Sequence, residues 1–370
     1  MTPTRELVST DAALADLCRA LDASAWIALD TEFLRERTYY ARLCLIQIGT
    51  PEFVVCVDPL AIERLEPLNA LLQNTRCAKV LHAARQDLEV FNDLFRVVPA
   101  PLFDTQIAAA YLGHDDQIGY AALVTAITGV TLAKAHTRAD WSVRPLGAEQ
   151  IQYAEDDVRY LVPVYEALHE QLGQAGRLAW VEDDCARLTE PALYAADPAE
   201  AWRRLRGGAD LAVANQQMLR ALAAFREKTA QARNLPRGWV LRDEVLYELA
   251  RAAPQTRAEL SAIPGLEEGA RQRWGEDLLA CIEAGQRAEP QRLWERTAPP
   301  TPEQSALGKQ LMETVRTVAR ENELSPALLA TRRDVEKMVR GTDPTQVLRG
   351  WRAKLIGERL TALLLPKMAS

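Results

Sequence analysis

Two carboxylates, Asp30 and Glu32, directly follow the apolar run Ala-Trp-Ile-Ala-Leu at residues 25–29. In a β-strand, residues i and i+2 point to the same face, so we expect these two side chains to lie side by side. Buried charges of one sign are costly without a compensating cation. The pattern therefore has two interpretations: a divalent metal ion bound between the acids, or a strand that ends at Leu29 and leaves both acids in water.

Two further acids occur at positions where an α/β fold can build a site. Asp87 falls in the first turns of a helix expected directly after a short apolar strand, and the carboxyl ends of strands are where such sites form. Alternatively, Asp87 is an acid favoured by the helix macrodipole. Tyr153 and Asp157 are spaced i, i+4 on a predicted helix and share a face. They form either a plain side-chain pair or a tyrosine beside a metal ligand. His82 is expected to be a core or helix-capping residue.

The elements that would position these residues alternate between strands and helices. Strands that first run as a meander and then alternate with helices predict an α/β domain with a mixed sheet. The expected strands are 25–33, 42–49, 53–58, 78–82 and 102–105, and the expected helices are 10–22, 64–72, 83–95, 106–112 and 149–161.

The acids and the tyrosine form a combination typical of one class of nuclease. The set Asp30, Glu32, Asp87, Tyr153 and Asp157 resembles the motifs of the DEDDy exonucleases, which use four carboxylates and a tyrosine.

Two longer strings narrow the resemblance to bacterial ribonuclease D. They are Asp-Trp-Ser-Val-Arg-Pro-Leu at 140–146 and Arg-Thr-Tyr-Tyr at 37–40. The resemblance covers essentially the whole chain. The chain departs from the family pattern at Ala135 and His136, where a small or acidic residue is usual.

The resemblance implies a ribonuclease H-like core and a metal-dependent 3′→5′ exoribonuclease that releases 5′-mononucleotides. Two divalent ions, Mg²⁺ or Mn²⁺, would activate water and neutralise phosphoryl charge, and such hard ions prefer carboxylate oxygens. By analogy, Asp30 would contact both ions, Glu32 and Asp157 the ion beside the attacking water, and Asp87 the second ion. Tyr153 would orient that water, because an ordinary tyrosine pKa of about 10 makes a poor base near neutrality.

From Leu211 onward the pattern becomes all-helical. The turn Ile-Pro-Gly-Leu at 263–266 and its neighbours resemble the HRDC domain shared by RecQ-type helicases and ribonuclease D, and residues 304–366 repeat this pattern as a diverged copy. The fold class expected is thus an α/β ribonuclease H-like domain followed by two small all-α domains. The expected boundaries are an exonuclease domain at 1–192, a linker at 193–210, a first HRDC-type domain at 211–289, a Pro-rich linker at 290–302 and a second, HRDC-like domain at 303–370.

Charge is distributed unevenly along the chain. Residues 1–201 hold 16 Lys and Arg against 30 Asp and Glu, a net charge of −14, whereas residues 202–370 hold 28 against 21, a net charge of +7. The basic half suggests a polyanion partner, with ordinary surface variation as the alternative. The resemblance implies RNA with a 3′ end, such as tRNA precursors. Candidate substrate contacts are Phe33, Gln47, Arg203, Arg204, Arg332, Arg333 and Arg352.

The remaining features describe the setting and the competing functions. Six scattered cysteines without a C-x-x-C pair argue against a zinc site and fit a reducing compartment. The sequence has no signal-peptide pattern and no run apolar enough to span a membrane, so we expect a cytoplasmic protein, monomeric and without an obligate protein partner.

The alternatives to an exoribonuclease are a DNA exonuclease of the same chemistry and a catalytically silent RNA-binding protein. The intact set of four acids argues against the latter.

Overall fold

The computed structural model describes residues 3–132, 139–294, 298–342 and 347–364 of the 370-residue chain, so Ala135 and His136 lie outside the described residues. The chain forms two compact units. Unit 1 comprises Met1–Leu34, Leu43–Leu193 and Pro299–Ser370, and unit 2 comprises Arg35–Arg42 and Tyr194–Ala298. Within the described ranges, no helix has both the length and the apolar character needed to cross a membrane.

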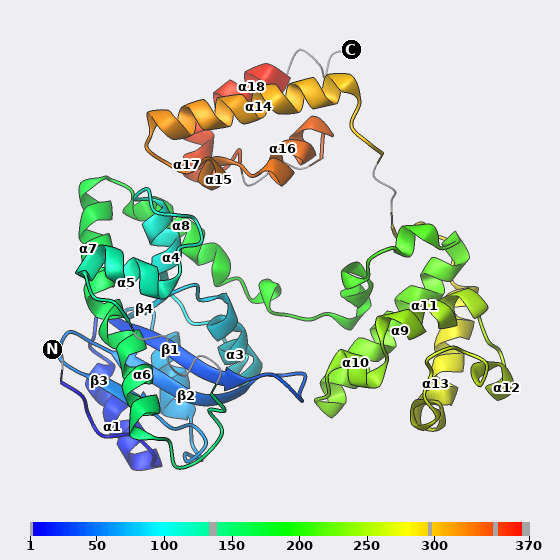
Figure 1. Cartoon of the computed structure of the whole chain (residues 1–370), viewed down its shortest axis with the longest axis horizontal. Helices are drawn as coiled ribbons and strands as arrows, with labels where there is room; N and C mark the ends of the chain where they lie inside the picture. Colours follow the sequence, from blue (N-terminus) through cyan, green and yellow to red (C-terminus); the bar gives the residue numbers. More distant parts are fainter. Residues whose placement is uncertain (1–2, 133–138, 295–297, 343–346, 365–370) are drawn as a thin grey trace. The chain divides into compact units, whose positions relative to one another are not determined.

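A five-stranded mixed sheet lies at the centre of unit 1 (Figure 1). Its strand order is β3-β2-β1-β4-β5, with β1 parallel to β4, β4 parallel to β5, and β2 antiparallel to β3. The middle strand β1 carries Ile27, Ala28 and Leu29, which are fully buried. The strands are β1 (Trp26–Leu34), β2 (Arg42–Gly49), β3 (Val54–Val57), β4 (Ala78–Leu81) and β5 (Leu102–Asp104). The mixed sheet predicted from the sequence is confirmed.

Helices cover this sheet, and one of them approaches it closely. A Cβ atom on Gly49 of β2 would lie 3.0 Å from the carbonyl oxygen of Val158 in α6, so this glycine lets the helix that carries Asp157 pack against the sheet. The helices are α1 (Asp11–Leu21), α2 (Glu66–Gln73), α3 (Arg85–Phe95), α4 (Thr105–Ala110), α5 (Tyr120–Thr128), α6 (Ala148–Arg159), α7 (Leu161–Gln174) and α8 (Leu178–Leu188).

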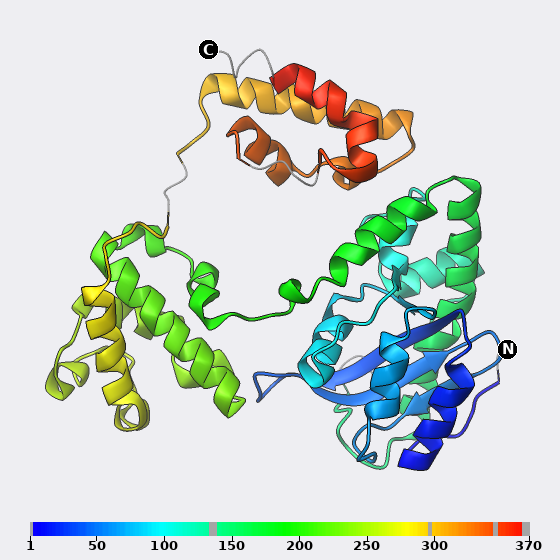
Figure 2. The same cartoon turned by 180° about the vertical axis from the view of Figure 1, so that it is seen from behind.

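The C-terminal helices belong to the same unit as the sheet (Figure 2). Trp351 stacks on Trp180 of α8 with ring centroids 4.7 Å apart and packs edge-on against Tyr111. Arg352 donates two hydrogen bonds, of 2.7 and 2.6 Å, to the Asp184 carboxylate of α8. These helices are α14 (Pro302–Glu321), α15 (Pro326–Leu329), α16 (Arg332–Val339), α17 (Gly350–Arg352), the π-helix η4 (Ala353–Gly357) and α18 (Glu358–Leu364).

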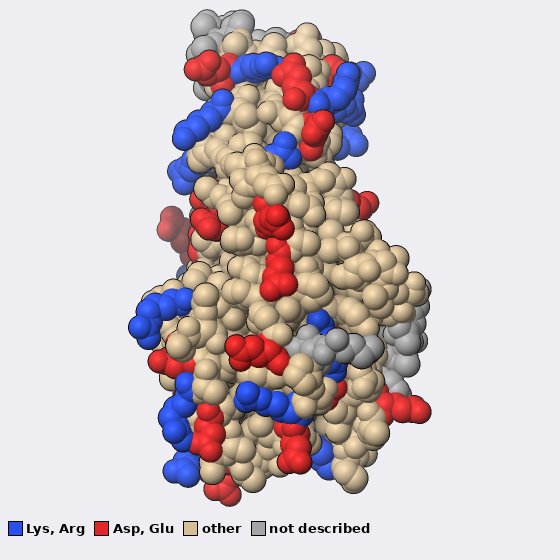
Figure 3. Space-filling model, turned by 90° about the vertical axis from the view of Figure 1, so that its left-hand side faces the viewer, with Lys and Arg blue, Asp and Glu red and all other residues tan. Residues whose placement is uncertain are grey.

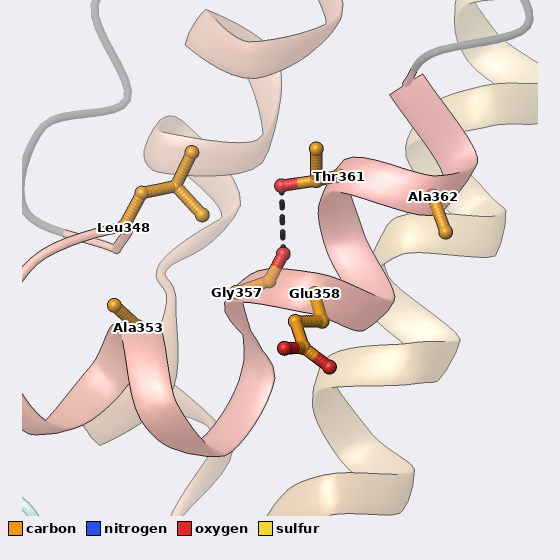
Figure 4. Close-up of a pocket in the computed structure, with 6 residues that line it drawn as sticks. All are labelled: Leu348, Ala353, Gly357, Glu358, Thr361 and Ala362. Carbon is orange, nitrogen blue, oxygen red and sulfur yellow. Dashed lines mark hydrogen bonds between the residues drawn. The ribbon is translucent and has the colours of Figure 1, made fainter.

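A shallow pocket of about 420 Å³ lies beside the π-helix (Figure 4). Its walls are mostly apolar, and the Thr361 hydroxyl donates to the Gly357 carbonyl at 2.8 Å. Its lining residues do not include any of those expected to be catalytic.

Unit 2 is helical around a core of leucines from several helices. The expected linker 193–210 contains the helical segment η2 (Pro198–Arg204), which buries Trp202 in this core. The Trp294 ring, from the expected Pro-rich linker, packs on the Trp202 ring with centroids 4.8 Å apart. Large aromatic side chains gain too much from burial to remain in an extended tether. The main helices are α9 (Val213–Arg233), α10 (Arg237–Val240), α11 (Asp243–Ala252), α12 (Arg257–Leu260) and α13 (Glu268–Arg287).

The segment Arg35–Arg42 also belongs to unit 2. The Tyr39 hydroxyl donates to Glu227, a carboxylate that is 1% exposed, and the Asn234 side chain accepts the Tyr39 and Tyr40 backbone N–H groups at 3.0 Å. Arg237 forms a bidentate pair with the same Glu227, at 2.5 and 2.7 Å. The Arg-Thr-Tyr-Tyr string is therefore anchored by a buried polar network.

Candidate active site

Three of the four expected metal ligands converge in the structure. Asp30 and Glu32 project from β1, and Asp157 projects from α6. Each offers a carboxylate oxygen that lies within 4.8 Å of the other two. The i, i+2 spacing on a strand thus places both β1 acids on one side, as predicted. An all-oxygen donor set of this kind suits Mg²⁺ or Mn²⁺.

The electrostatics of this group favour a bound cation. Burial raises the pKa of Asp30 well above its ordinary value, and the nearby Asp87, Asp157 and Glu32 raise it further. Burial, then the Asp157 and Asp87 charges, raise the pKa of Glu32 to about 8. Burial, together with the Asp156 charge, raises the pKa of Asp157 to about 7. Without a positive partner these acids resist ionisation, and a bound divalent cation would reverse that preference.

Asp87 lies beside this group but is held separately. It is on the first turn of α3, 8% exposed, and it accepts a hydrogen bond of 2.5 Å from the Thr31 hydroxyl. Burial raises the pKa of Asp87 to about 6, while the Thr31 hydrogen bond opposes that shift. Sequence reasoning missed Thr31, although its place between Asp30 and Glu32 and its opposite orientation were signals that could have identified it.

Tyr153 lies one turn before Asp157 on α6 and packs near Trp141, with ring centroids 6.1 Å apart. Burial raises the pKa of its hydroxyl above the ordinary value, and the Asp157, Glu32 and Asp30 charges add to the shift. A hydroxyl with a raised pKa holds its proton more firmly near neutrality. Tyr153 is therefore suited to donate or accept a hydrogen bond, and it is a poor general base.

The string at 140–146 supports Tyr153 through Arg144. The Arg144 guanidinium donates to both Asp58 carboxylate oxygens at 2.6 and 2.8 Å, and to the Cys44 and Trp141 carbonyls at 2.7 Å each. These bonds tie the loop to β2 and to the end of β3. The loop in turn keeps Trp141, which is 2% exposed, against the tyrosine.

Two neighbouring residues complete the surroundings. Tyr120 donates to the Asp156 carbonyl at 3.1 Å, and burial, then the Asp157 and Asp30 charges, raise its pKa well above the ordinary value. Its sequence neighbours carry no motif, so no signal marked it. His82 has both ring nitrogens in hydrogen bonds, with the Thr105 hydroxyl at 3.0 Å and the Ile118 carbonyl at 3.1 Å. It is a structural histidine, as expected.

Two of the candidate substrate contacts, Gln47 and Arg352, are buried. Gln47 is fully buried in β2, where neither amide atom finds a hydrogen-bond partner among the described residues. Arg352 is 9% exposed, and its guanidinium is occupied by Asp184, which makes it a structural cation.

The other candidates remain predictions. Phe33 is partly exposed on β1. Arg203 pairs with Glu200, and Arg204 contacts the buried Glu227 at 3.2 Å. Arg332 and Arg333 are exposed. On the face shown in Figure 3, basic and acidic side chains are interspersed.

Comparisons with known proteins identify the family. A family described as 3'-5' exonuclease matches residues 5–173, and the HRDC domain matches residues 215–282. A protein named Ribonuclease D from Acidiphilium cryptum is 40% identical over 365 residues, which cover 96% of this chain and 92% of that protein. The corresponding values for Ribonuclease D of Pseudomonas paraeruginosa are 37% identity and 97% of each chain.

Solved structures give the same result. The chain is similar to Escherichia coli RNase D, described as an exoribonuclease involved in structured RNA processing, with a TM-score of 0.88 and 34% identity over 99% of this chain and 100% of that one. It is also similar to the catalytic core of RRP6 from Trypanosoma brucei, with a TM-score of 0.60 and 26% identity over 77% of this chain and 80% of that one.

Proposed function

The chain belongs to the ribonuclease D family and is a 3′→5′ exoribonuclease; from this premise we propose how its residues act and on which RNA. It hydrolyses RNA from the 3′ end and releases 5′-mononucleotides with the help of two divalent ions, Mg²⁺ or Mn²⁺. Its substrates are RNAs in the maturation of stable species, tRNA precursors above all. The convergence of Asp30, Glu32 and Asp157 on one point carries this proposal.

The donor set fits the ions. Asp30, Glu32 and Asp157 supply oxygens to one common point, and Asp87 supplies a carboxylate beside it. When bound, two such ions supply an activated water, a stabilised leaving oxygen and neutralised phosphoryl charge. The raised pKa values of Glu32 and Asp157 are what four crowded acids show before they receive their cations.

The protein's own contribution is to hold the reacting groups in place. Tyr153 orients the attacking water through its hydroxyl, and Trp141 fixes the ring. Thr31 orients the Asp87 carboxylate through its hydrogen bond. Orientation of this kind lowers the barrier because the entropy cost is met when the fold forms.

The substrate assignment is supported by the relatives. The Escherichia coli enzyme is described as acting in structured RNA processing. We propose that the helical domains at 211–289 and 303–370 contact the RNA backbone, with Arg203, Arg204, Arg332 and Arg333 as candidate phosphate contacts and Phe33 as a candidate contact at the 3′ terminus. Such contacts are sequence-independent, as an enzyme of stable RNA requires. The protein acts as a monomer in the cytoplasm.

A tRNA precursor with a short 3′ trailer tests this function. We expect the wild type with Mn²⁺ to shorten the trailer one nucleotide at a time, with 5′-mononucleotides as the product on thin-layer chromatography. Asp157→Asn should release none. Dinucleotide products, or trimming by Asp157→Asn at the wild-type rate, would contradict the proposal.

A further inference from the structure

Trp239 of unit 2 has no role in the proposed exonuclease chemistry. Of the residues that the structure describes, four large apolar side chains are exposed, and Trp239, at 59%, is the aromatic one among them. It lies on α10 (Figure 1), a short helix that α9 and α11 flank in sequence. An exposed tryptophan forgoes a large gain from burial, and tryptophan is enriched at interfaces.

Trp239 forms one wall of a pocket of about 300 Å³. The other walls come from the end of α10, from Val245 of α11, from the turn at Gly265 and from the start of α13. Gly238 beside the tryptophan leaves that side open, since a Cβ placed there would meet no atom within 4 Å. The pocket is of the size that suits one small planar group.

Two charged side chains line the same pocket. Arg242 and Glu267 are 73% and 77% exposed, and their closest charged atoms are 3.9 Å apart. A pair this exposed and this loose contributes little to stability. It leaves a guanidinium that can bind a phosphate and a carboxylate that can accept a hydrogen bond.

Arginines accompany the tryptophan in the sequence. Residues 233–242 contain three arginines and no acidic residue. Arg237 is held by Glu227, whereas Arg242 lines the pocket. An aromatic face beside a cation is how proteins bind single-stranded nucleic acid without sequence preference, because every base has a π-face.

We propose that the pocket at Trp239 is a stacking site for an unpaired base of the RNA substrate, with Arg242 on the adjoining phosphate. This inference rests on the proposed function, since it takes RNA as the ligand. A sequence-tolerant contact is what an exonuclease requires when its substrate presents every base in turn. The site would hold single-stranded segments and would give paired RNA no comparable contact.

Binding of a 5′-fluorescein single-stranded RNA of about 12 nucleotides tests the inference, by anisotropy on the full chain in EDTA so that no cleavage occurs. We expect Trp239→Ala to weaken binding about tenfold and Trp239→Phe to stay within about twofold. Leu193→Ala, which also removes an exposed apolar side chain, is the matched control and should bind as the wild type does. A Trp239→Ala protein that binds within twofold of the wild type would overturn the inference, as would a wild type that does not bind the RNA.

Removal of the bases separates stacking from other effects. On a strand of equal length whose residues are abasic, the wild type and Trp239→Ala should bind equally, because the partner of the tryptophan is gone. An undiminished difference would show that the residue acts elsewhere. Trp239→Ala should leave the salt dependence of binding unchanged, whereas Arg242→Gln should reduce the slope of log K against log salt by about 0.7.

Failure of the proposed function can be distinguished from failure of the stacking site. Metal-dependent shortening of the same RNA by the wild type, absent in Asp157→Asn, reports on the active site. Loss of this activity in the wild type would defeat the proposed function. Its presence together with unchanged RNA binding by Trp239→Ala would defeat only the stacking site.

Discussion

The Thr31 hydroxyl donates a 2.5 Å hydrogen bond to Asp87 and so joins the strand that carries two of the acids to the helix that carries another. Thr31 is 6% exposed and Asp87 8% exposed, so water does not substitute for this bond. The bond fixes the orientation of the Asp87 carboxylate, whose charge lies close enough to Asp30 to raise the Asp30 pKa. Thr31, which lies between Asp30 and Glu32, thus orients the Asp87 carboxylate.

Removal of that hydroxyl should therefore lower activity without dismantling the site. We expect Thr31→Val to reduce kcat about tenfold, as loss of a group that orients a metal ligand commonly does. The pKa of Asp87 should rise, because the hydrogen bond that lowers it is gone, and the acidic limb of the pH–rate profile should move to higher pH. Thr31→Ser should restore both. An unshifted profile in Thr31→Val would argue against this role.

Tyr153→Phe separates the orientation of water from metal binding. Loss of the hydroxyl should lower kcat by about 100-fold, since a misplaced nucleophile costs about that much. The Mn²⁺ titration should stay as in the wild type, whereas Asp30→Ala should weaken it strongly. Tyr165→Phe, whose ring packs between Trp26 and Phe103, is the matched control. A metal titration as disturbed as that of Asp30→Ala would make Tyr153 a ligand instead.

The raised pKa values make stability depend on pH and metal together. Glu32, at about 8, and Asp157, at about 7, hold protons more tightly in the folded state than in the unfolded state. Their contribution to folding is full below the unfolded pKa of about 4 and is lost as the pH rises through 7 and 8.

Thermal melts at pH 6 and pH 8 check this linkage. In EDTA, the Tm of the wild type relative to Glu32→Gln should fall as the pH rises from 6 to 8. The gain in Tm from Mn²⁺ should be larger at pH 8, because ionised carboxylates bind the ion without releasing a proton. A gain from Mn²⁺ that is equal at both pH values, or larger at pH 6, would refute the assignment.

We expect Arg352 to stabilise the fold through its pair with Asp184. Arg352→Ala leaves the Asp184 carboxylate, 13% exposed, without its cation, and we expect a loss of about 3 kcal/mol in urea unfolding. The double variant Arg352→Met with Asp184→Leu should recover most of it. The salt slope of RNA binding should not change in either variant. A smaller slope would return Arg352 to the phosphate contacts.

Much of the fold was readable from local patterns. Strand 42–49 was predicted with the limits that it has, and Asp30 with Glu32 followed from the alternation of a strand. The grouping of Asp157 with the β1 acids came from a resemblance, since periodicity gives the face of a helix and not the strand on which it packs.

Burial that the sequence did not predict depended on tertiary contacts. Arg352 and Gln47 looked like surface polar residues, but burial in the fold is set by partners distant in sequence: Asp184 for one and the helix above β2 for the other. For the same reason, truncation near residue 200 would expose Trp180, on which Trp351 stacks, so point variants test the helical region better. The burial of Trp202 was not predicted, because this residue begins a basic stretch that ends in two glycines.

The most direct test of the central claim is the shortening of a 5′-labelled single-stranded RNA by the wild type and by Asp157→Ala, with Mg²⁺ or Mn²⁺, beside a DNA of matched sequence. The account predicts a ladder of products from the 3′ end of the RNA with the wild type, lost in the variant and in EDTA, and weaker shortening of the DNA. Metal-independent shortening, or a full ladder from Asp157→Ala, would contradict it.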